Sequence, residues 1–148
     1  MTTTPPAEIG MSLEDVDTPA LLLDLDAFER NLDRMAAAIA DKPVKLRPHS
    51  KSHKCAVIGL EQMARGAVGL CCQKVGEAEA MVAGGVHNVL VSNQIVGRPK
   101  LLRLAALTKQ ANWIGVCADH SDNVDQLNEA ANAMDATLNV LVEIDTGA

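Results

Sequence analysis

The sequence predicts an α/β protein with a parallel sheet, and three observations lead to this fold class. First, short aliphatic runs alternate with helical patterns, and five of the runs are centred near residues 45, 70, 90, 115 and 141. Second, this spacing of ~20 to 26 residues leaves room for one strand and one helix in each repeat, and helical crossovers make successive strands parallel. Third, hydrophobic residues make up 48% of the chain, with one Phe, one Trp and no Tyr, so we expect an aliphatic core of helices packed on a sheet.

Two ways of closing such a sheet are open, a doubly wound sheet and a (β/α) barrel. The dinucleotide-binding form of the doubly wound sheet is not supported, because no G-x-G-x-x-G pattern follows a predicted strand. A complete (β/α)8 barrel needs about 250 residues, and five strands of an unclosed barrel would leave edges that promote aggregation. We therefore expect the chain to be the N-terminal part of a larger protein.

The first forty residues are expected to hold a lead-in, a strand and a helix. Residues 1–14 are polar and proline-containing and predict a flexible lead-in. The aliphatic run 20–25 predicts a strand. Asp26 then predicts the N-cap of a helix, with Glu29 as its capping-box partner, and this helix ends near Ala40. Its helical spacing is carried by Phe28, Leu32, Met35 and Ile39.

The alternating part of the chain begins at a short predicted strand over residues 44–46. The four strands predicted after it cover 68–72, 88–91, 113–118 and 138–144. The helices predicted between these strands cover 56–65, 75–83, a segment from about Pro99, and 122–134.

Composition excludes several classes of function. A net charge of −6 opposes general binding to a phosphate backbone, and the scarcity of aromatic residues opposes base stacking. The four cysteines show no zinc or redox spacing, so we interpret them as reduced thiols of a cytoplasmic protein. No apolar run approaches the ~20 residues of a membrane span. Nucleic acid and membrane are therefore not expected as partners.

The stretch 46–55 carries the chemistry. Six of its ten residues can carry or share a proton, namely Arg47, His49, Lys51, His53, Lys54 and Cys55. A lysine among cations holds its proton less tightly, and a neutral lysine is a nucleophile toward an aldehyde. Pyridoxal phosphate is the obvious biological aldehyde. The alternative is a solvated basic turn.

Residues 47–54, Arg-Pro-His-Ser-Lys-Ser-His-Lys, resemble the R-P-H-x-K-x-H-K signature of the D-threonine aldolase and D-serine dehydratase family. Residues 17–26 are similar to the strand that leads into this family's barrel, and 69–79 to the block after its second barrel strand. The resemblance covers residues 15–148. It implies a partial (β/α)8 TIM-type barrel of the alanine-racemase N-terminal type, without the rest of the barrel and the C-terminal β-domain.

The resemblance also implies the site residues. It assigns Lys51 as the Schiff-base lysine of pyridoxal 5'-phosphate. His49 is then a candidate proton carrier, and Arg47 and Gln73 are candidate cofactor-binding residues. The alternatives are a loop-fixing histidine, a salt bridge of Arg47 in the barrel floor, and a helix-capping Gln73.

Further polar residues follow the predicted strands, where barrel enzymes place catalytic groups. They are Ser92, Asn93, Asp119, His120 and Asp145. Polar strand ends that only meet water are the alternative, and His53 is expected to hold its loop or cap a helix.

The resemblance implies a lyase that cleaves D-3-hydroxy amino acids, of the D-threonine or 3-hydroxyaspartate type, to glycine and an aldehyde. The alternatives are a D-serine or 3-hydroxyaspartate dehydratase of the same family, a barrel that only carries the cofactor, and an inert fragment. The resemblance further implies a homodimer and a divalent metal (Mn, Mg or Zn). The metal ligands of the family lie in a C-terminal motif, so no ligand is predicted in this chain.

Overall fold

A four-stranded parallel sheet is the centre of the computed structural model, which describes residues 5 and 7–147. Its strands are β1 (Leu70–Cys72), β2 (Asn88–Val91), β3 (Trp113–Ala118) and β4 (Asn139–Val142). They are hydrogen-bonded in chain order, and each neighbouring pair is parallel. The α/β fold class is confirmed.

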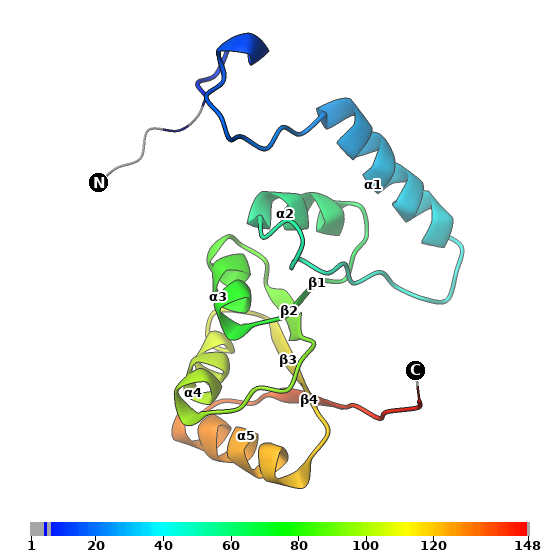
Figure 1. Ribbon diagram of the computed structural model, residues 1–148. Helices are drawn as coiled ribbons and strands as arrows, with labels where there is room; N and C mark the ends of the chain where they lie inside the picture. The colour runs from blue at the N-terminus through cyan, green and yellow to red at the C-terminus, as the bar shows by residue number, and fades with distance from the viewer. Residues whose placement is uncertain (1–4, 6, 148) are drawn as a thin grey trace.

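Three helices connect these strands and cover the same face of the sheet (Figure 1). They are α3 (Val75–Ala83), α4 (Arg98–Leu107) and α5 (Ser121–Ala133). A doubly wound sheet carries helices on both faces and reverses its strand order, whereas a barrel advances in one direction. The observed arrangement is consistent with part of a (β/α) barrel.

The strands alternate between two environments. The side chains that point toward the helices form the core and include Leu70, Val89, Val91, Ile114 and Val116, each no more than 1% exposed. The residues between them, such as Cys71 and Cys117, point to the opposite face and are partly exposed. Because side chains of a strand alternate, the core occupies the helix-covered face, and the opposite face is the less buried one.

The predicted strand over residues 20–25 is wrong. Residues 20–24 are not part of the sheet, and Leu21 and Leu22 are exposed. Helix α1 (Leu25–Ile39) begins earlier than predicted, because Asp24 is its N-cap and accepts a hydrogen bond from the Ala27 N–H at 2.9 Å. Asp26 therefore lies inside the first turn, and the aliphatic run pairs with none of the four strands.

The predicted strand over residues 44–46 is also wrong, so the sheet has four strands and not five. The segment does run beside β1, and the Cys71 N–H donates to the Pro48 carbonyl at 2.7 Å. A single parallel bridge forms, between His49 and Cys71. Pro48 has no N–H, so it cannot donate the bond that would extend this ladder toward residue 46.

The remaining elements follow the predictions closely. Strands β2 and β3 and helix α3 have the predicted bounds, while β1 and β4 are shorter than predicted. Helix α2 (Ala56–Ala64) precedes β1. The 3-10 helix η1 (Leu13–Asp15) ends the lead-in, of which residues 1–4 and 6 lie outside the described part. No helix of the described chain is both long and apolar enough to cross a membrane.

Candidate functional site

The loop that carries Lys51 lies at the C-terminal ends of β1 and β2. The Ser50 N–H donates to the Cys71 carbonyl at 2.8 Å, which fixes the start of the loop to β1. The Lys54 N–H donates back to the Ser50 carbonyl at 2.8 Å and closes a tight turn. Lys51 sits in this turn and is exposed. Its backbone is thus fixed while its amine stays accessible.

Ser50 anchors the loop and was not predicted from the sequence. Its side chain is fully buried, and its hydroxyl donates to the Cys71 carbonyl at 2.9 Å and lies 3.2 Å from the Cys72 Sγ. Burial raises the pKa of the Cys72 thiol to about 11. Cys72 is therefore a neutral packing residue. Ser50 occupies a variable position of the motif, so no pattern pointed to it.

The imidazole of His49 links Lys51 to the next strand. Its Nδ1 accepts a hydrogen bond from the Lys51 N–H at 3.2 Å. Its Nε2 lies 3.3 Å from the hydroxyl oxygen of Ser92, which follows β2. Burial and the positive charge of Lys51 lower the pKa of His49, because both disfavour the imidazolium. The structure thus brings two further predicted residues, Lys51 and Ser92, into contact with the imidazole of His49, whose lowered pKa favours its neutral form.

Gln73 joins the loops after β1 and β2 through its backbone. Its carbonyl accepts a hydrogen bond from the Asn93 Nδ2 at 3.0 Å. Its N–H donates to the Glu77 Oε2 at 2.8 Å. The N-cap of α3 is Lys74, so Gln73 does not hold the capping position. The predicted contact of Gln73 with a cofactor stays a prediction.

Glu77 ties three segments of the site together and was not among the residues predicted from the sequence. Besides the Gln73 N–H, its carboxylate contacts the Lys54 Nζ at 3.5 Å, and it retains 12% of its side-chain exposure. Burial alone would raise the pKa of Glu77, but the hydrogen bond from Gln73 and the ammonium of Lys54 outweigh it and lower the pKa. The charged carboxylate thus holds α3 against the loop of Lys51.

Replacing Glu77 by Gln is expected to lower the free energy of unfolding by about 1 kcal/mol at pH 7, the net value of a hydrogen bond to a charged group less what the amide retains. Because the pKa is lowered in the folded state, this stabilisation is present above the unfolded pKa of about 4.3 and is lost as pH falls through the folded value. Urea unfolding from pH 7 to pH 3 should show the two proteins converging in acid. A constant difference across this range would contradict the assignment.

Arg47 lies at the other end of the strands. Its Nη1 is 3.4 Å from the Leu70 carbonyl and 3.5 Å from the Asn88 carbonyl, at the starts of β1 and β2. Its guanidinium lies 4.9 Å from the ring centre of Trp113, at the start of β3. Arg47 therefore braces the N-terminal strand ends, whereas Lys51 lies beyond the C-terminal ends. Its predicted contact with a cofactor stays a prediction.

The other candidate residues have local structural contacts. The His53 Nδ1 accepts from the Cys55 N–H at 3.1 Å, and the His120 Nδ1 accepts from the Asp122 N–H at 3.2 Å and caps α5. Asp119 and Asp145 line an open cavity of about 750 Å³ past β3 and β4. Across residues 5 and 7–147, no group of three or more His, Cys, Asp or Glu side chains is placed to hold a metal ion.

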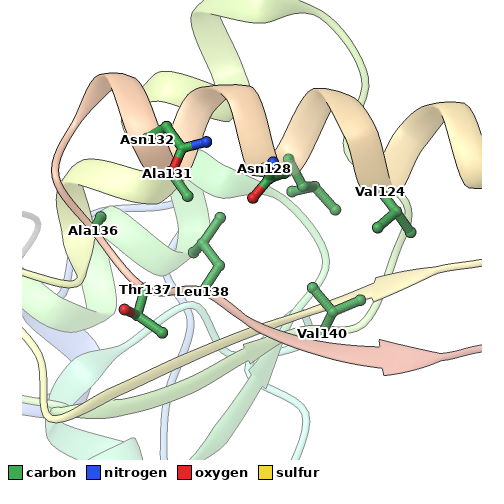
Figure 2. Close-up of a pocket in the computed structure, with 9 residues that line it drawn as sticks. Val124, Asn128, Ala131, Asn132, Ala136, Thr137, Leu138 and Val140 are labelled. Carbon is green, nitrogen blue, oxygen red and sulfur yellow. The ribbon is translucent and has the colours of Figure 1, made fainter.

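A separate pocket of about 350 Å³ lies between α5 and β4 (Figure 2). Apolar side chains such as Val124, Leu138 and Val140 line it, with Asn128, Asn132 and Thr137 among them. None of its lining residues is ionisable. It lies beside α5, away from the loop of Lys51, and it has no group suited to acid–base or covalent chemistry.

The chain is similar in sequence to a known family and to several aldolases. The family described as "Alanine racemase, N-terminal domain" matches residues 23–148. A D-threonine aldolase of Arthrobacter sp is 48% identical over 143 residues, which are 97% of this chain and 38% of that protein. A 3-hydroxy-D-aspartate aldolase of Paracoccus denitrificans (strain Pd 1222) is 42% identical over 144 residues, 97% of this chain and 37% of that protein.

Structural comparison agrees with these matches. The crystal structure of D-threonine aldolase from Filomicrobium marinum has a TM-score of 0.94 and 57% sequence identity, covering 98% of this chain and 39% of that one.

A dehydratase is also similar to this chain in sequence. This D-threo-3-hydroxyaspartate dehydratase of Delftia sp. (strain HT23) is 38% identical over 79 residues, 53% of this chain and 21% of that protein. The chain spans less than two fifths of the length of the aldolases that it matches.

Proposed function

We propose, since this chain belongs to the family of the alanine racemase N-terminal domain, that residues 15–148 form the N-terminal portion of a pyridoxal-phosphate-dependent aldolase. Its substrates would be D-3-hydroxy amino acids of the D-threonine or 3-hydroxyaspartate type, cleaved to glycine and an aldehyde. One observation carries the proposal. An exposed lysine, whose backbone N–H donates to the imidazole of His49, lies at the C-terminal ends of parallel strands in a chain whose sequence follows the aldolases along 97% of its length.

The residues of the site fit the aldehyde end of the cofactor. Lys51 offers an exposed primary amine on a loop that Ser50 anchors by its buried hydroxyl. Pyridoxal phosphate, when bound, supplies an aldehyde for that amine and a ring that withdraws electrons from the reacting carbon of the substrate. We assign Lys51 to covalent capture and His49 to the same pocket, with Arg47 and Gln73 as candidate supporting residues.

The chain's own residues would orient the reaction and move protons. Cleavage removes the proton of the substrate hydroxyl, breaks the bond between Cα and Cβ, and returns a proton to Cα. His49 is the candidate proton carrier: its lowered pKa keeps the imidazole neutral near pH 7, and its Nδ1 accepts a proton only by giving up the hydrogen bond from the Lys51 N–H. The bridge between His49 and Cys71 holds this residue at the edge of the sheet.

The aldolase branch is favoured over the dehydratase branch. Both aldolase relatives match 97% of the chain at 42–48% identity, whereas the D-threo-3-hydroxyaspartate dehydratase is 38% identical over 53% of the chain in sequence and 28% identical over 88% of it in the structural match. The choice between the two reactions depends on this similarity.

The test is turnover of D-threonine, with pyridoxal phosphate and Mn²⁺, by the whole enzyme of which this chain is the proposed N-terminal portion. We expect glycine and acetaldehyde in equal amounts, measured by amino-acid analysis and by alcohol dehydrogenase coupling. Ammonia and a 2-oxo acid would instead indicate the dehydratase. Cofactor capture with neither product would reduce the proposal to a cofactor-binding fragment.

The proposal has four further parts. A divalent ion (Mn, Mg or Zn) takes part, held by ligands outside the residues described. The active protein is a homodimer in the cytoplasm. Residues 1–14 serve as a lead-in. The net charge of −6 supports a small-molecule substrate rather than nucleic acid as its partner.

A further inference from the structure

We infer that Ser92 is a positioning residue for His49: its hydroxyl holds the imidazole in the tautomer with hydrogen on Nε2 and keeps the ring fixed beside Lys51. The contact between the two side chains, 3.3 Å from Oγ to Nε2, joins the Lys51 loop to the end of β2. Its importance for the reaction rests on the proposed function, whereas the tautomer itself does not.

The direction of each hydrogen bond follows from its neighbours. A backbone N–H can only donate, so the bond from the Lys51 N–H makes the His49 Nδ1 an acceptor. A neutral imidazole carries one hydrogen, which must then lie on Nε2. Nε2 therefore donates to the Ser92 hydroxyl oxygen.

Ser92 is well placed to accept this bond. Its N–H donates to the Cys72 carbonyl at 2.9 Å, which extends the pairing of β1 and β2 beyond Cys72 and Val91. Its hydroxyl donates to the same carbonyl, with an oxygen separation of 3.4 Å. Because the hydrogen of the hydroxyl is directed to this carbonyl, the oxygen is free to accept a hydrogen bond from the His49 Nε2.

The arrangement opposes charging of the ring. An imidazolium carries hydrogen on both nitrogens, so its Nδ1–H would face the Lys51 N–H and that hydrogen bond would be lost. The ammonium of Lys51 adds repulsion, while the carboxylate of Glu77 favours the charge. Ser92 accepts from Nε2 in either state. Its role is therefore to select the tautomer and orientation of the ring rather than its charge.

The experiment is NMR of the ¹⁵N-labelled protein without cofactor, at a pH where His49 is neutral. Long-range proton–nitrogen correlations report how the hydrogen is divided between Nδ1 and Nε2, and His49→Gln identifies the signals. We expect hydrogen on Nε2 in the natural protein. In Ser92→Ala, loss of one hydrogen bond should shift the ratio of tautomers about five-fold toward Nδ1 and move the two nitrogen shifts together. Ser92→Thr, which keeps a hydroxyl, should restore the natural pattern.

Two results would overturn the inference. One is hydrogen on Nδ1 in the natural protein, which needs no variant to be folded. The other is a Ser92→Ala protein whose backbone spectrum is native and whose His49 nitrogen shifts are unchanged. Ser121→Ala, a change of an exposed serine at the start of α5, is the matched control. Failure of cofactor capture at Lys51 would instead count against the proposed function, since the tautomer is measured without cofactor.

Discussion

Replacing Lys51 by Ala is expected to abolish covalent capture of pyridoxal phosphate by the protein. Borohydride reduces the adduct of a lysine amine and an aldehyde to a stable secondary amine, so the mass of one reduced pyridoxyl phosphate should appear on the natural protein and be lost from the variant. The physical reason is that Lys51 presents its amine from a turn whose backbone is fixed at Ser50. Intact-mass spectrometry, followed by peptide mapping, measures both the yield and the position.

Lys54→Ala is the matched control for this prediction. Lys54 lies three residues away in the same loop, and its amine contacts the carboxylate of Glu77 at 3.5 Å. Its loss should leave the yield of capture within about five-fold, because a partly exposed ion pair contributes at most about 1 kcal/mol to the order of the loop. An undiminished adduct in Lys51→Ala, or an adduct mapped to Lys54, would remove the central assignment of the site.

The elements of the fold that could be predicted are those marked by a local sequence pattern, such as an aliphatic run or a nearby glycine or proline. Strands β2 and β3 are aliphatic runs buried on the helix-covered face, and glycines or prolines near their flanking helices mark the limits. The N-terminal strand prediction failed because an aliphatic run needs a partner as well as a pattern. Residues 20–24 have the pattern but pair with no strand of the described sheet, and Leu21 is exposed.

Site residues that lie close together in the sequence could be predicted, whereas residues that join the site only through contacts in the fold could not. The motif around Lys51 and the polar strand ends were visible, and the structure joins His49 to Ser92 across 43 residues. Ser50, Glu77 and Trp113 gave no signal, because a buried hydroxyl, a bridging carboxylate and an indole beneath a guanidinium are defined by their neighbours. Arg47 lies near the N-terminal ends of β1 and β2, four residues before Lys51 along the chain, and its predicted contact with a cofactor stays a prediction.

Leu104→Ala is expected to lower the free energy of unfolding by about 2–5 kcal/mol, the usual cost of emptying a buried leucine site. Leu104 lies on α4, is fully buried, and belongs to the core between the helices and the sheet. Because small domains are stable by only about 5–15 kcal/mol, this change removes a large share of the total. Urea unfolding measures it from the midpoint and slope.

Leu25→Ala is the same chemical change at a site that is 62% exposed, and it should cost under about 1 kcal/mol. The contrast between the two variants tests where the core lies. If both losses were small, α4 would not be packed as the structure has it. If Leu104→Ala alone is costly, and its folded fraction still captures cofactor at Lys51, then the helix-covered face supplies stability while the strand ends supply chemistry. A barrel architecture predicts this separation of stability from chemistry, because the packed core holds the strands in place while the loops at the strand ends bind and react.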